Sequence, residues 1–340
     1  MDKHTLDLID RLLKSPEPSL RWKVRVNVLD EDPTSPALRK LSREIKGSPR
    51  VRALLSRQGR DGRIASRRGV YDKWQGAHWV LAALADLGYP PGDRSLVPAA
   101  KDVLDCWLDD YYFREFEPTT PAQVYQKKGV PVIAGRHRRC ASQQGNALWS
   151  LLKLDLGGKR VDQLAERLLH WQWPDGGWNC DKRPMADTSS FHETLLPLRG
   201  LALHARLTKS KASSRASRRA AEVFLERHLY KRRTNKKIIN PEFLLLHYPA
   251  YWHYDILAGL KVMAEAGFIT DPRCGDALDL LESRRLPDGG WSAERRYYKV
   301  SSALNNGCDY ADWGPVGKTK MNEWVTGDAL YVLRSAGRLA

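Results

Sequence analysis

The chain has 340 residues, of which 42% are hydrophobic and 28% are charged, and it carries a formal net charge of +16. These values are typical of a globular, soluble protein, and no apolar run approaches the roughly 20 residues that a membrane-spanning helix needs. The amino-terminal residues lack the apolar core and the small-residue cleavage site of a signal peptide. The five cysteines are an odd number in a large chain, so we expect reduced thiols and a cytoplasmic protein.

The first 57 residues are predicted to form short helices. Ser35-Pro36 and Ser48-Pro49 each provide an N-cap hydroxyl followed by a proline at the first helical position, and Ser19 precedes the apolar-periodic stretch LRWKVRVNVL. The apolar spacing in these stretches indicates helices with one buried face. We therefore expect residues 1–57 to be a helical extension of a main domain that spans residues 58–340.

The main domain is predicted to consist of repeated helical hairpins. A period of about 50 to 60 residues begins after residue 57, and amphipathic helices alternate with apolar helices that contain small residues. Clean two-residue alternation is almost absent, so no significant sheet is expected. Hairpins of this kind cannot bury their apolar faces alone and must stack. We therefore predict an all-α fold, an α/α-toroid, whose inner helices are residues 78–88, 146–157, 193–204, 254–267 and 326–337.

A recurring turn supports this prediction. It reads QWPDGGWNCD at 172–181 and LPDGGWSAE at 286–294, with an echo, RQGRDGRI, at 57–64. The first two stretches resemble the QW-type repeat of the squalene–hopene cyclases and of the protein prenyltransferase β-subunits. The resemblance covers residues 58–340 and implies an α/α-toroid in which the turn joins outer to inner helices. It also implies an enzyme that acts on an isoprenoid or another apolar substrate.

The acid of the cyclases is not found in this chain. Those enzymes protonate an alkene through an Asp-x-Asp-Asp motif, which disfavours cyclisation by that acid here. The aspartate clusters that come nearest lack its spacing: Asp30-Glu31-Asp32, Asp105 with Asp109 and Asp110, and Asp309 with Asp312.

A zinc site is implied by the prenyltransferase resemblance. The β-subunits hold zinc through an Asp, a Cys and a His near the starts of inner helices. Cys140 precedes one predicted inner helix, and His192 opens the next. The family's Asp would fall on Arg138, which cannot ligate zinc, and Cys180 could take its place. Two cysteines and a histidine suit Zn²⁺. Further ligands or supporting groups would come from His253, His137, Asp181 and Asp187.

The starts of the inner helices are expected to line the cavity of the toroid. Aromatic faces suit isoprenoid tails, carbocations or sugar rings. Glu193 and Asp255 are predicted to act as general acid or base if they are shielded from water. The predicted substrate-binding residues are Trp74, His78, Gln144, Trp252, Tyr254 and Trp324.

Three functions remain open on the sequence. The first is an enzyme that acts on an isoprenoid or other apolar substrate with the help of zinc. The second is a carbohydrate-active α/α-barrel, which would use aromatic stacking and two carboxylates drawn from Glu193, Asp255 and Glu323. The third is a non-catalytic scaffold, in which the basic stretch 208–237 binds an anionic partner such as nucleic acid.

Overall fold

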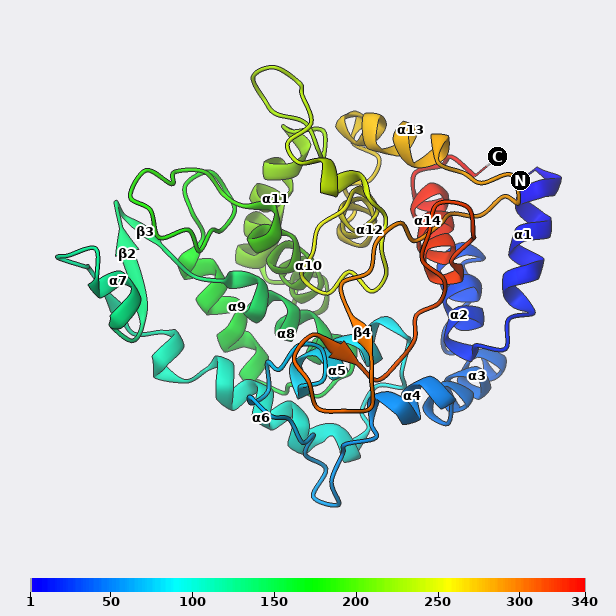
Figure 1. The fold of residues 1–340 in the computed structure, drawn as a ribbon, viewed down its shortest axis with the longest axis horizontal. Coiled ribbons are helices and arrows are strands. Elements are labelled where there is room, and N and C mark those ends of the chain that lie inside the picture. Colours follow the sequence, from blue (N-terminus) through cyan, green and yellow to red (C-terminus); the bar gives the residue numbers. More distant parts are fainter. Residues whose placement is uncertain (1, 340) are drawn as a thin grey trace.

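The computed structural model describes residues 2–339, and helices dominate its regular structure (Figure 1). An inner layer surrounds a central axis and consists of α2 (Pro18–Lys23) with its π-helical continuation η1 (Val24–Val28), α5 (Ala77–Asp86), α8 (Ala141–Lys153), α10 (Phe191–Thr208), α12 (Ile256–Ala266) and α14 (Glu323–Ser335). An outer layer consists of α1 (Lys3–Leu13), α3 (Pro36–Lys46), α6 (Val97–Trp107), α9 (Arg160–Trp171), α11 (Lys211–Leu225) and α13 (Gly275–Ser283). Inner helices contact one another in the order α5, α8, α10, α12, α14 and η1. The fold is therefore an α/α-toroid, as predicted.

The remaining elements are short. They comprise α4 (Pro49–Leu54), α7 (Gln123–Gln126) and the 3₁₀ turns Arg94–Leu96, Asp110–Tyr112, Pro241–Leu244 and Pro272–Cys274. The strands β1 (Glu115–Phe116), β2 (Val130–Ile133) and β3 (Arg136–His137) form one small sheet, with β1 parallel and β3 antiparallel to β2. A second sheet joins β4 (Lys299–Val300) to β5 (Cys308–Asp309) in parallel. No strand among the described residues exceeds four residues, in line with the expectation of no significant sheet.

The two layers differ in how the sequence distributes apolar residues. In α9 the buried residues are Val161, Leu164, Ala165, Leu168 and Trp171, which form one stripe on an otherwise polar helix. In α8, by contrast, nearly every residue of the stretch 141–151 is buried. A helix that is buried on all sides lies between other helices rather than at the surface. This difference explains which helices line the axis.

The first 57 residues contribute to the same ring. The side chains of Ser35 and Ser48 cap α3 and α4 with a proline at the next position, as predicted. Ser19 instead lies inside α2, whose N-cap is Glu17, because the Glu17 carboxylate accepts a hydrogen bond from the Ser19 N–H at 3.2 Å. The end of α2 meets the end of α5, where Lys23 pairs with Asp86 at 2.9 Å. The ring closes through this amino-terminal segment.

The tryptophans of the recurring turn occupy equivalent places. The indole N–H groups of Trp178 and Trp291 each donate to a carbonyl ten residues earlier in the outer helix, at 3.0 and 2.7 Å. Their backbone N–H groups donate to hydroxyls on the following inner helix, Thr194 at 3.2 Å and Thr326 at 2.9 Å. Each tryptophan thus ties an outer helix to an inner one, which explains why the turn recurs.

The weakest copy of the turn keeps its bonding pattern without the tryptophan. The side chain of Gln172 donates to the carbonyl of Gly176 at 2.6 Å, and that of Gln58 donates to Gly62 at 3.2 Å. In the third copy Arg285 replaces the glutamine and donates to the carbonyl of Gly289 at 2.9 Å. A long donor four residues before the glycine therefore closes the turn in all three copies.

Glycines allow the closest approach between inner helices. A Cβ atom on Gly145 of α8 would lie 2.3 Å from the nitrogen of Pro197 in α10. A Cβ atom on Gly200 of α10 would lie 2.7 Å from the carbonyl oxygen of Gly145. Neither distance is compatible with a real side chain, so the predicted role of small residues in the inner helices is confirmed.

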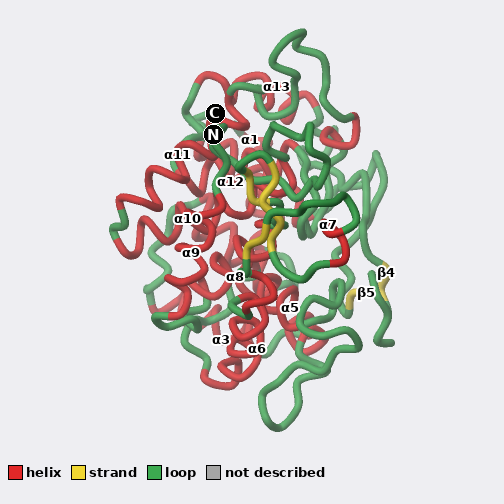
Figure 2. The backbone as a smooth tube through the Cα atoms, turned by 90° about the vertical axis from the view of Figure 1, so that its left-hand side faces the viewer, coloured by secondary structure: helices red, strands yellow, loops and turns green. Residues whose placement is uncertain are grey.

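The long loops gather at one face of the ring (Figure 2). These loops follow outer helices and lead into the amino-terminal ends of inner helices, at 108–140, 172–190, 226–255 and 284–322. We call this side the loop face. No helix in the described part of the chain is both long and apolar enough to cross a membrane.

Candidate active site in the axial cavity

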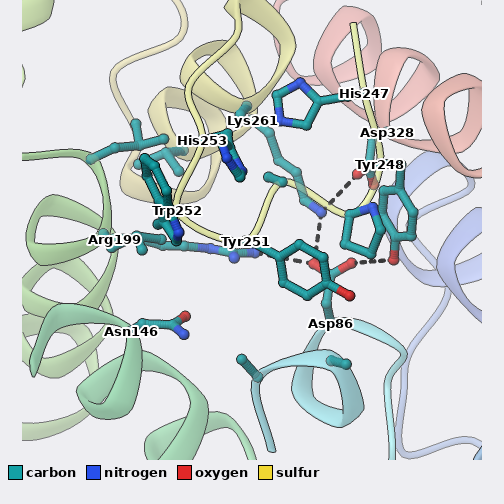
Figure 3. Close-up of a pocket in the computed structure, with 18 of the residues that line it drawn as sticks. Asp86, Asn146, Arg199, His247, Tyr248, Tyr251, Trp252, His253, Lys261 and Asp328 are labelled. Carbon is teal, nitrogen blue, oxygen red and sulfur yellow. Dashed lines mark hydrogen bonds and ion pairs between the residues drawn. The ribbon is translucent and has the colours of Figure 1, made fainter. Parts of the chain in front are cut away.

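A cavity of about 80 Å³ lies within the ring, between α5, α8, α10 and α12 (Figure 3). The segment 247–253, which precedes α12, crosses the axis and forms one wall of the cavity. Trp252 and His253 in this wall are only partly buried, so the cavity approaches solvent there. The other lining residues that matter for the argument are Trp79, Asp86, Asn146, Trp149, Arg199, His247, Tyr248, Tyr251, Lys261 and Asp328.

Histidine 247 forms a buried pair with Asp255. The Nδ1 atom of His247 lies 2.7 Å from a carboxylate oxygen of Asp255, and both side chains are 1% exposed. Asp255 is held in place because it is the N-cap of α12 and accepts the Ala258 N–H at 2.7 Å. Burial disfavours the charged imidazolium, but the Asp255 carboxylate outweighs it and raises the pKa of His247. The pair therefore resembles the orienting half of a catalytic triad.

Three buried nitrogen atoms on this wall have no hydrogen-bond partner among the described residues. They are Nε2 of His247, Nδ1 of His253 and Nε1 of Trp252. Since buried polar atoms are nearly always bonded, three such atoms on residues that line one cavity indicate a polar ligand or water there. Burial, followed by the charge of His247, lowers the pKa of His253 to about 3. His253 is therefore neutral at physiological pH.

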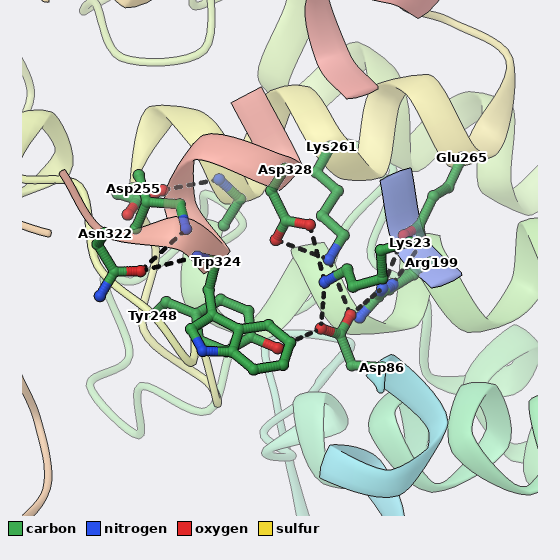
Figure 4. A network of polar contacts seen from close by, with 12 residues as sticks. Lys23, Asp86, Arg199, Tyr248, Asp255, Lys261, Glu265, Asn322, Trp324 and Asp328 are labelled. Carbon is green, nitrogen blue, oxygen red and sulfur yellow. Dashed lines mark hydrogen bonds and ion pairs between the residues drawn. The ribbon is translucent and has the colours of Figure 1, made fainter. Parts of the chain in front are cut away.

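A network of charges forms the floor of the cavity (Figure 4). Lys261 lies 2.8 Å from Asp86 and 2.9 Å from Asp328, and Lys23 lies 2.9 Å from each of the same carboxylates. Asp86 also accepts from Arg199 at 3.3 Å. Burial alone would raise the pKa of Asp86, but the surrounding cations outweigh it and hold this pKa well below its ordinary value.

The floor limits the chemistry of the site. A general acid must carry a proton near neutral pH, and a carboxylate bound by two lysines does not. Asp86 therefore does not provide the protonated carboxyl that a two-carboxylate glycosidase uses. His247 also lines the cavity, and it combines a ring nitrogen that has no hydrogen-bond partner with a raised pKa.

The predicted substrate-binding residues are placed unevenly. Trp252 lines the cavity. Trp74 and Trp324 lie behind its wall, where Trp74 stacks on Tyr251 with ring centroids 3.9 Å apart, and Trp324 stacks on Tyr248 at 5.2 Å. The loop tyrosines thus cover the two tryptophans that were expected to face a ligand.

Tyr254, His78 and Gln144 also lie in the core rather than on the cavity wall. The hydroxyl of Tyr254 donates to a backbone carbonyl at 2.6 Å. His78 is bonded on both ring nitrogens, by Trp107 and Asn146 at 3.1 Å each, and burial lowers its pKa to about 3. Gln144 is fully buried. The hydroxyl of Tyr254 and both ring nitrogens of His78 are therefore already bonded within the protein.

The predicted zinc ligands separate into two groups. Cys140 and Cys180 lie together, and the third residue beside them is Glu193, with one ligand atom of each within 4.8 Å of the others. His192 contacts Trp252, with ring centroids 5.8 Å apart, and His253 belongs to the cavity wall. Glu193 replaces the two histidines in the predicted ligand set, because it is one residue further into α10 and turns toward the thiols.

The other predicted supporting residues take ordinary roles. Arg138 donates to backbone carbonyls at 2.7 and 3.2 Å, and Asp181 pairs with Arg183 at 2.5 Å. Asp187 accepts from the neighbouring hydroxyl of residue 188 at 2.9 Å. His137 lies with Glu115 and His170 in a second, more exposed group of ligand atoms.

The basic stretch 208–237 divides into paired and unpaired cations. Lys231 pairs with Asp276, and Arg233 pairs with Glu226. An open groove between α10, α11 and the end of α12 is lined by further cations for which no ion pair is found among the described residues: Arg206, Lys209, Lys211, Arg215 and Arg218.

Sequence comparisons give no family for the chain: no family model matches it, and no curated protein matches it. The unsaturated glucuronyl hydrolase from Bacillus sp. GL1, responsible for the degradation of glycosaminoglycan, matches with a TM-score of 0.44 and 14% identity, over 93% of this chain and 84% of that one. The GH76 α-mannanase of Bacteroides thetaiotaomicron matches with a TM-score of 0.45 and 14% identity, over 99% and 94% of the two chains.

These findings correct the sequence-based assignment. The expected membership of the squalene–hopene cyclase and prenyltransferase family was wrong, since the similar structures are glycoside-degrading enzymes. The expected isoprenoid ligand was wrong on the same finding. The turn motif had marked the helical hairpin, which is a property of the architecture rather than of one reaction.

Proposed function

We propose that the protein is a carbohydrate-active enzyme that binds a sugar in the axial cavity and moves a proton through His247. The observation that carries this proposal is the unpartnered Nε2 atom of His247, on a cavity wall, with Asp255 bound to the opposite nitrogen.

The size and lining of the cavity support a small polar ligand. A volume of about 80 Å³ is several times the ~10–15 Å³ that one water needs, so the cavity has room for several waters or for part of a small polar ligand. Trp79, Trp149 and Trp252 provide aromatic surface, and Asn146 and Arg199 provide hydrogen-bond donors. Binding sites commonly combine apolar walls with a few such polar groups.

The dyad supports acid–base chemistry. Because Asp255 accepts the proton on Nδ1, neutral His247 presents a bare Nε2 that accepts a proton from a sugar hydroxyl, a ring carbon or a water. The imidazolium form presents an N–H at the same place and donates. The raised pKa of His247 favours the protonated form that a general acid requires, and the same nitrogen can act as a base once it has given up its proton.

The remaining parts of the site would orient the ligand. Lys261 is paired with Asp86 and Asp328, so these three side chains would hold hydroxyl groups of the ligand in place. Glu193, the other carboxylate that the sequence favoured, does not line this cavity. We also retain the proposal of a reducing, cytoplasmic compartment, which the five free cysteines support.

The test is a turnover screen. Neutral and uronate-containing oligosaccharides are incubated with the wild type and with His247→Gln, and products are detected by mass spectrometry. The matched control is His228→Gln, since His228 also pairs with an aspartate, Asp276 at 3.0 Å, but lies outside the cavity. We expect turnover in the wild type and in the control, and a loss of at least about 100-fold in His247→Gln, the scale of general acid–base catalysis. Equal rates in all three proteins would refute the role of His247.

A further inference from the structure

Cys140, Cys180 and Glu193 meet at the loop face, at the amino-terminal ends of two adjacent inner helices. Cys140 immediately precedes α8, and Glu193 lies in the first turn of α10. Cys180 follows the recurring turn that joins α9 to α10. Ligand atoms of the three residues all lie within 4.8 Å of one another, and the Cys180 sulfur lies 3.4 Å from a Glu193 oxygen. Three separate segments of the chain therefore converge on one point.

The separation of these atoms is close to what a tetrahedral metal ion requires. Bond lengths of about 2.3 Å to sulfur and 2.0–2.2 Å to oxygen place two tetrahedral ligand atoms about 3.6 Å apart. The observed sulfur–oxygen distance of 3.4 Å agrees with this value to within a few tenths of an ångström. The other two separations are at most 4.8 Å.

The negative charges of the three ligand groups also call for a divalent cation. Glu193 accepts a hydrogen bond from the Ser142 N–H at 3.0 Å. Two thiolates and one carboxylate would carry three negative charges. Arg139, which neighbours Cys140 and Glu193, offsets one of them, and a divalent ion would offset the other two.

We propose that Cys140, Cys180 and Glu193 bind a zinc ion. Thiolate sulfur and carboxylate oxygen are both ligands of Zn²⁺, and three protein ligands leave a fourth position for a water molecule. The bound ion clamps the loop after α9 to the starts of α8 and α10. Binding releases the two thiol protons, so affinity falls as the pH is lowered. The site is separate from the axial cavity and does not depend on the proposed function.

The alternative use of two adjacent thiols is a disulfide bond. Formation of a bond between Cys140 and Cys180 would release two electrons and two protons to an oxidant and would remove both thiolates as ligands. A protein kept under reducing conditions avoids this reaction. The mass of the intact chain distinguishes the two states, since the disulfide lowers it by two hydrogens.

The experiment measures metal content and affinity on protein made without an affinity histidine tag. The wild type, Cys140→Ser, Cys180→Ser and Glu193→Gln are purified with a reductant, dialysed against buffered Zn²⁺ and analysed by elemental mass spectrometry. Two control variants address other sources of zinc binding. Cys106→Ser removes a half-buried thiol outside the cluster, and His170→Gln disrupts the exposed Glu115, His137 and His170 group.

We expect about one zinc per chain in the wild type and in both controls, and at least about a tenfold weaker affinity in each cluster variant. Replacement by Co²⁺ should give the intense visible and near-ultraviolet bands of tetrahedral thiolate coordination in the wild type. This readout holds even if a cysteine variant fails to fold. Absence of zinc from the reduced wild type, loss of zinc in His170→Gln alone, or a reduced preparation that carries the disulfide would each overturn the proposal.

Discussion

Replacement of Asp86 by Asn tests the buried charge network most severely. Asp86 accepts from Lys261 at 2.8 Å, from Lys23 at 2.9 Å and from the Tyr248 hydroxyl at 2.7 Å, and its side chain is 17% exposed. The amide would leave Lys23, Lys261 and Arg199 in a buried site with two carboxylates. An uncompensated buried charge costs about 3–5 kcal/mol.

That cost is a large part of the about 5–15 kcal/mol that stabilises a folded protein. With a urea dependence of about 3 kcal/mol per M, it corresponds to a decrease of about 1 M or more in the midpoint of unfolding. Equilibrium unfolding followed by circular dichroism and by tryptophan fluorescence measures this midpoint. Lowering the pH through the depressed pKa of Asp86 should remove the difference, because the stabilising carboxylate of the wild type is then also neutral.

The matched control is Asp105→Asn. Asp105 also contacts two cations, Lys101 at 2.5 Å and Arg160 at 2.8 Å, but its side chain is 44% exposed. Solvent screens such pairs, so we expect a loss below about 1 kcal/mol. If Asp86→Asn lowered the midpoint no more than Asp105→Asn does, the network would be solvated and the reasoning from burial would be wrong.

Three further predictions concern other parts of the molecule. His247→Gln should destabilise the protein more at pH 6 than at pH 9. The raised pKa of His247 means that its pairing with Asp255 stabilises the fold below a pH of about 6.5, and this stability is lost as the pH rises through the pKa of His247 in the folded protein. An equal effect at both pH values would contradict the pairing with Asp255. Trp291→Ala should lower the free energy of unfolding by about 3–5 kcal/mol, since this side chain is fully buried and bonded to the outer helix; a loss below about 1 kcal/mol in urea unfolding would show that the turn tryptophan is not a structural tie. Gly145→Ala should lower the free energy of unfolding by about 1–3 kcal/mol, because the added methyl group clashes with α10. In Gly275→Ala the nearest neighbour of the methyl group would be 3.9 Å away, so this control should leave the free energy of unfolding unchanged or raise it.

The fold was predictable because its signals are local and repeated. The Asp-Gly-Gly-Trp motif is itself a short, repeated stretch, and at both Trp178 and Trp291 it makes the same bonds to the outer helix before it and to the inner helix after it. Ser35 and Ser48 cap helices through equally local contacts. Short motifs of this kind can be recognised in the sequence without knowledge of the rest of the fold.

The cavity wall was not predictable in this way. The segment 247–253 has no helical or strand period, and its path across the axis depends on contacts with distant elements. It places Tyr251 over Trp74 and Tyr248 over Trp324, so two tryptophans expected to face a ligand became core residues. The sequence identifies which aromatic residues are near the axis but not which of them an irregular loop covers.

Some of the site residues could likewise be predicted from the sequence, and others could not. Asp255 was identified because it lies at the predicted start of an inner helix, where side chains were expected to line the cavity. Its partner His247 was missed, since it lies eight residues earlier in the loop and no spacing rule joins the two. Cys140 and Cys180 were brought together by the repeat, as expected. Glu193 was taken for an acid rather than a ligand because the side-chain direction in the first turn of α10 cannot be read from the sequence.

The most direct test of the account is sugar binding in the axial cavity. Saturation-transfer difference NMR would be recorded with a panel of neutral and acidic mono- and disaccharides on the wild type and on Ala82→Phe, in which the added ring occupies the cavity next to Asp86. The account predicts transfer to at least one sugar with the wild type and its loss in the variant, with the same circular dichroism spectrum for both proteins. No transfer to any sugar with the wild type, or equal transfer with both proteins, would contradict the assignment of the axial cavity as a carbohydrate site.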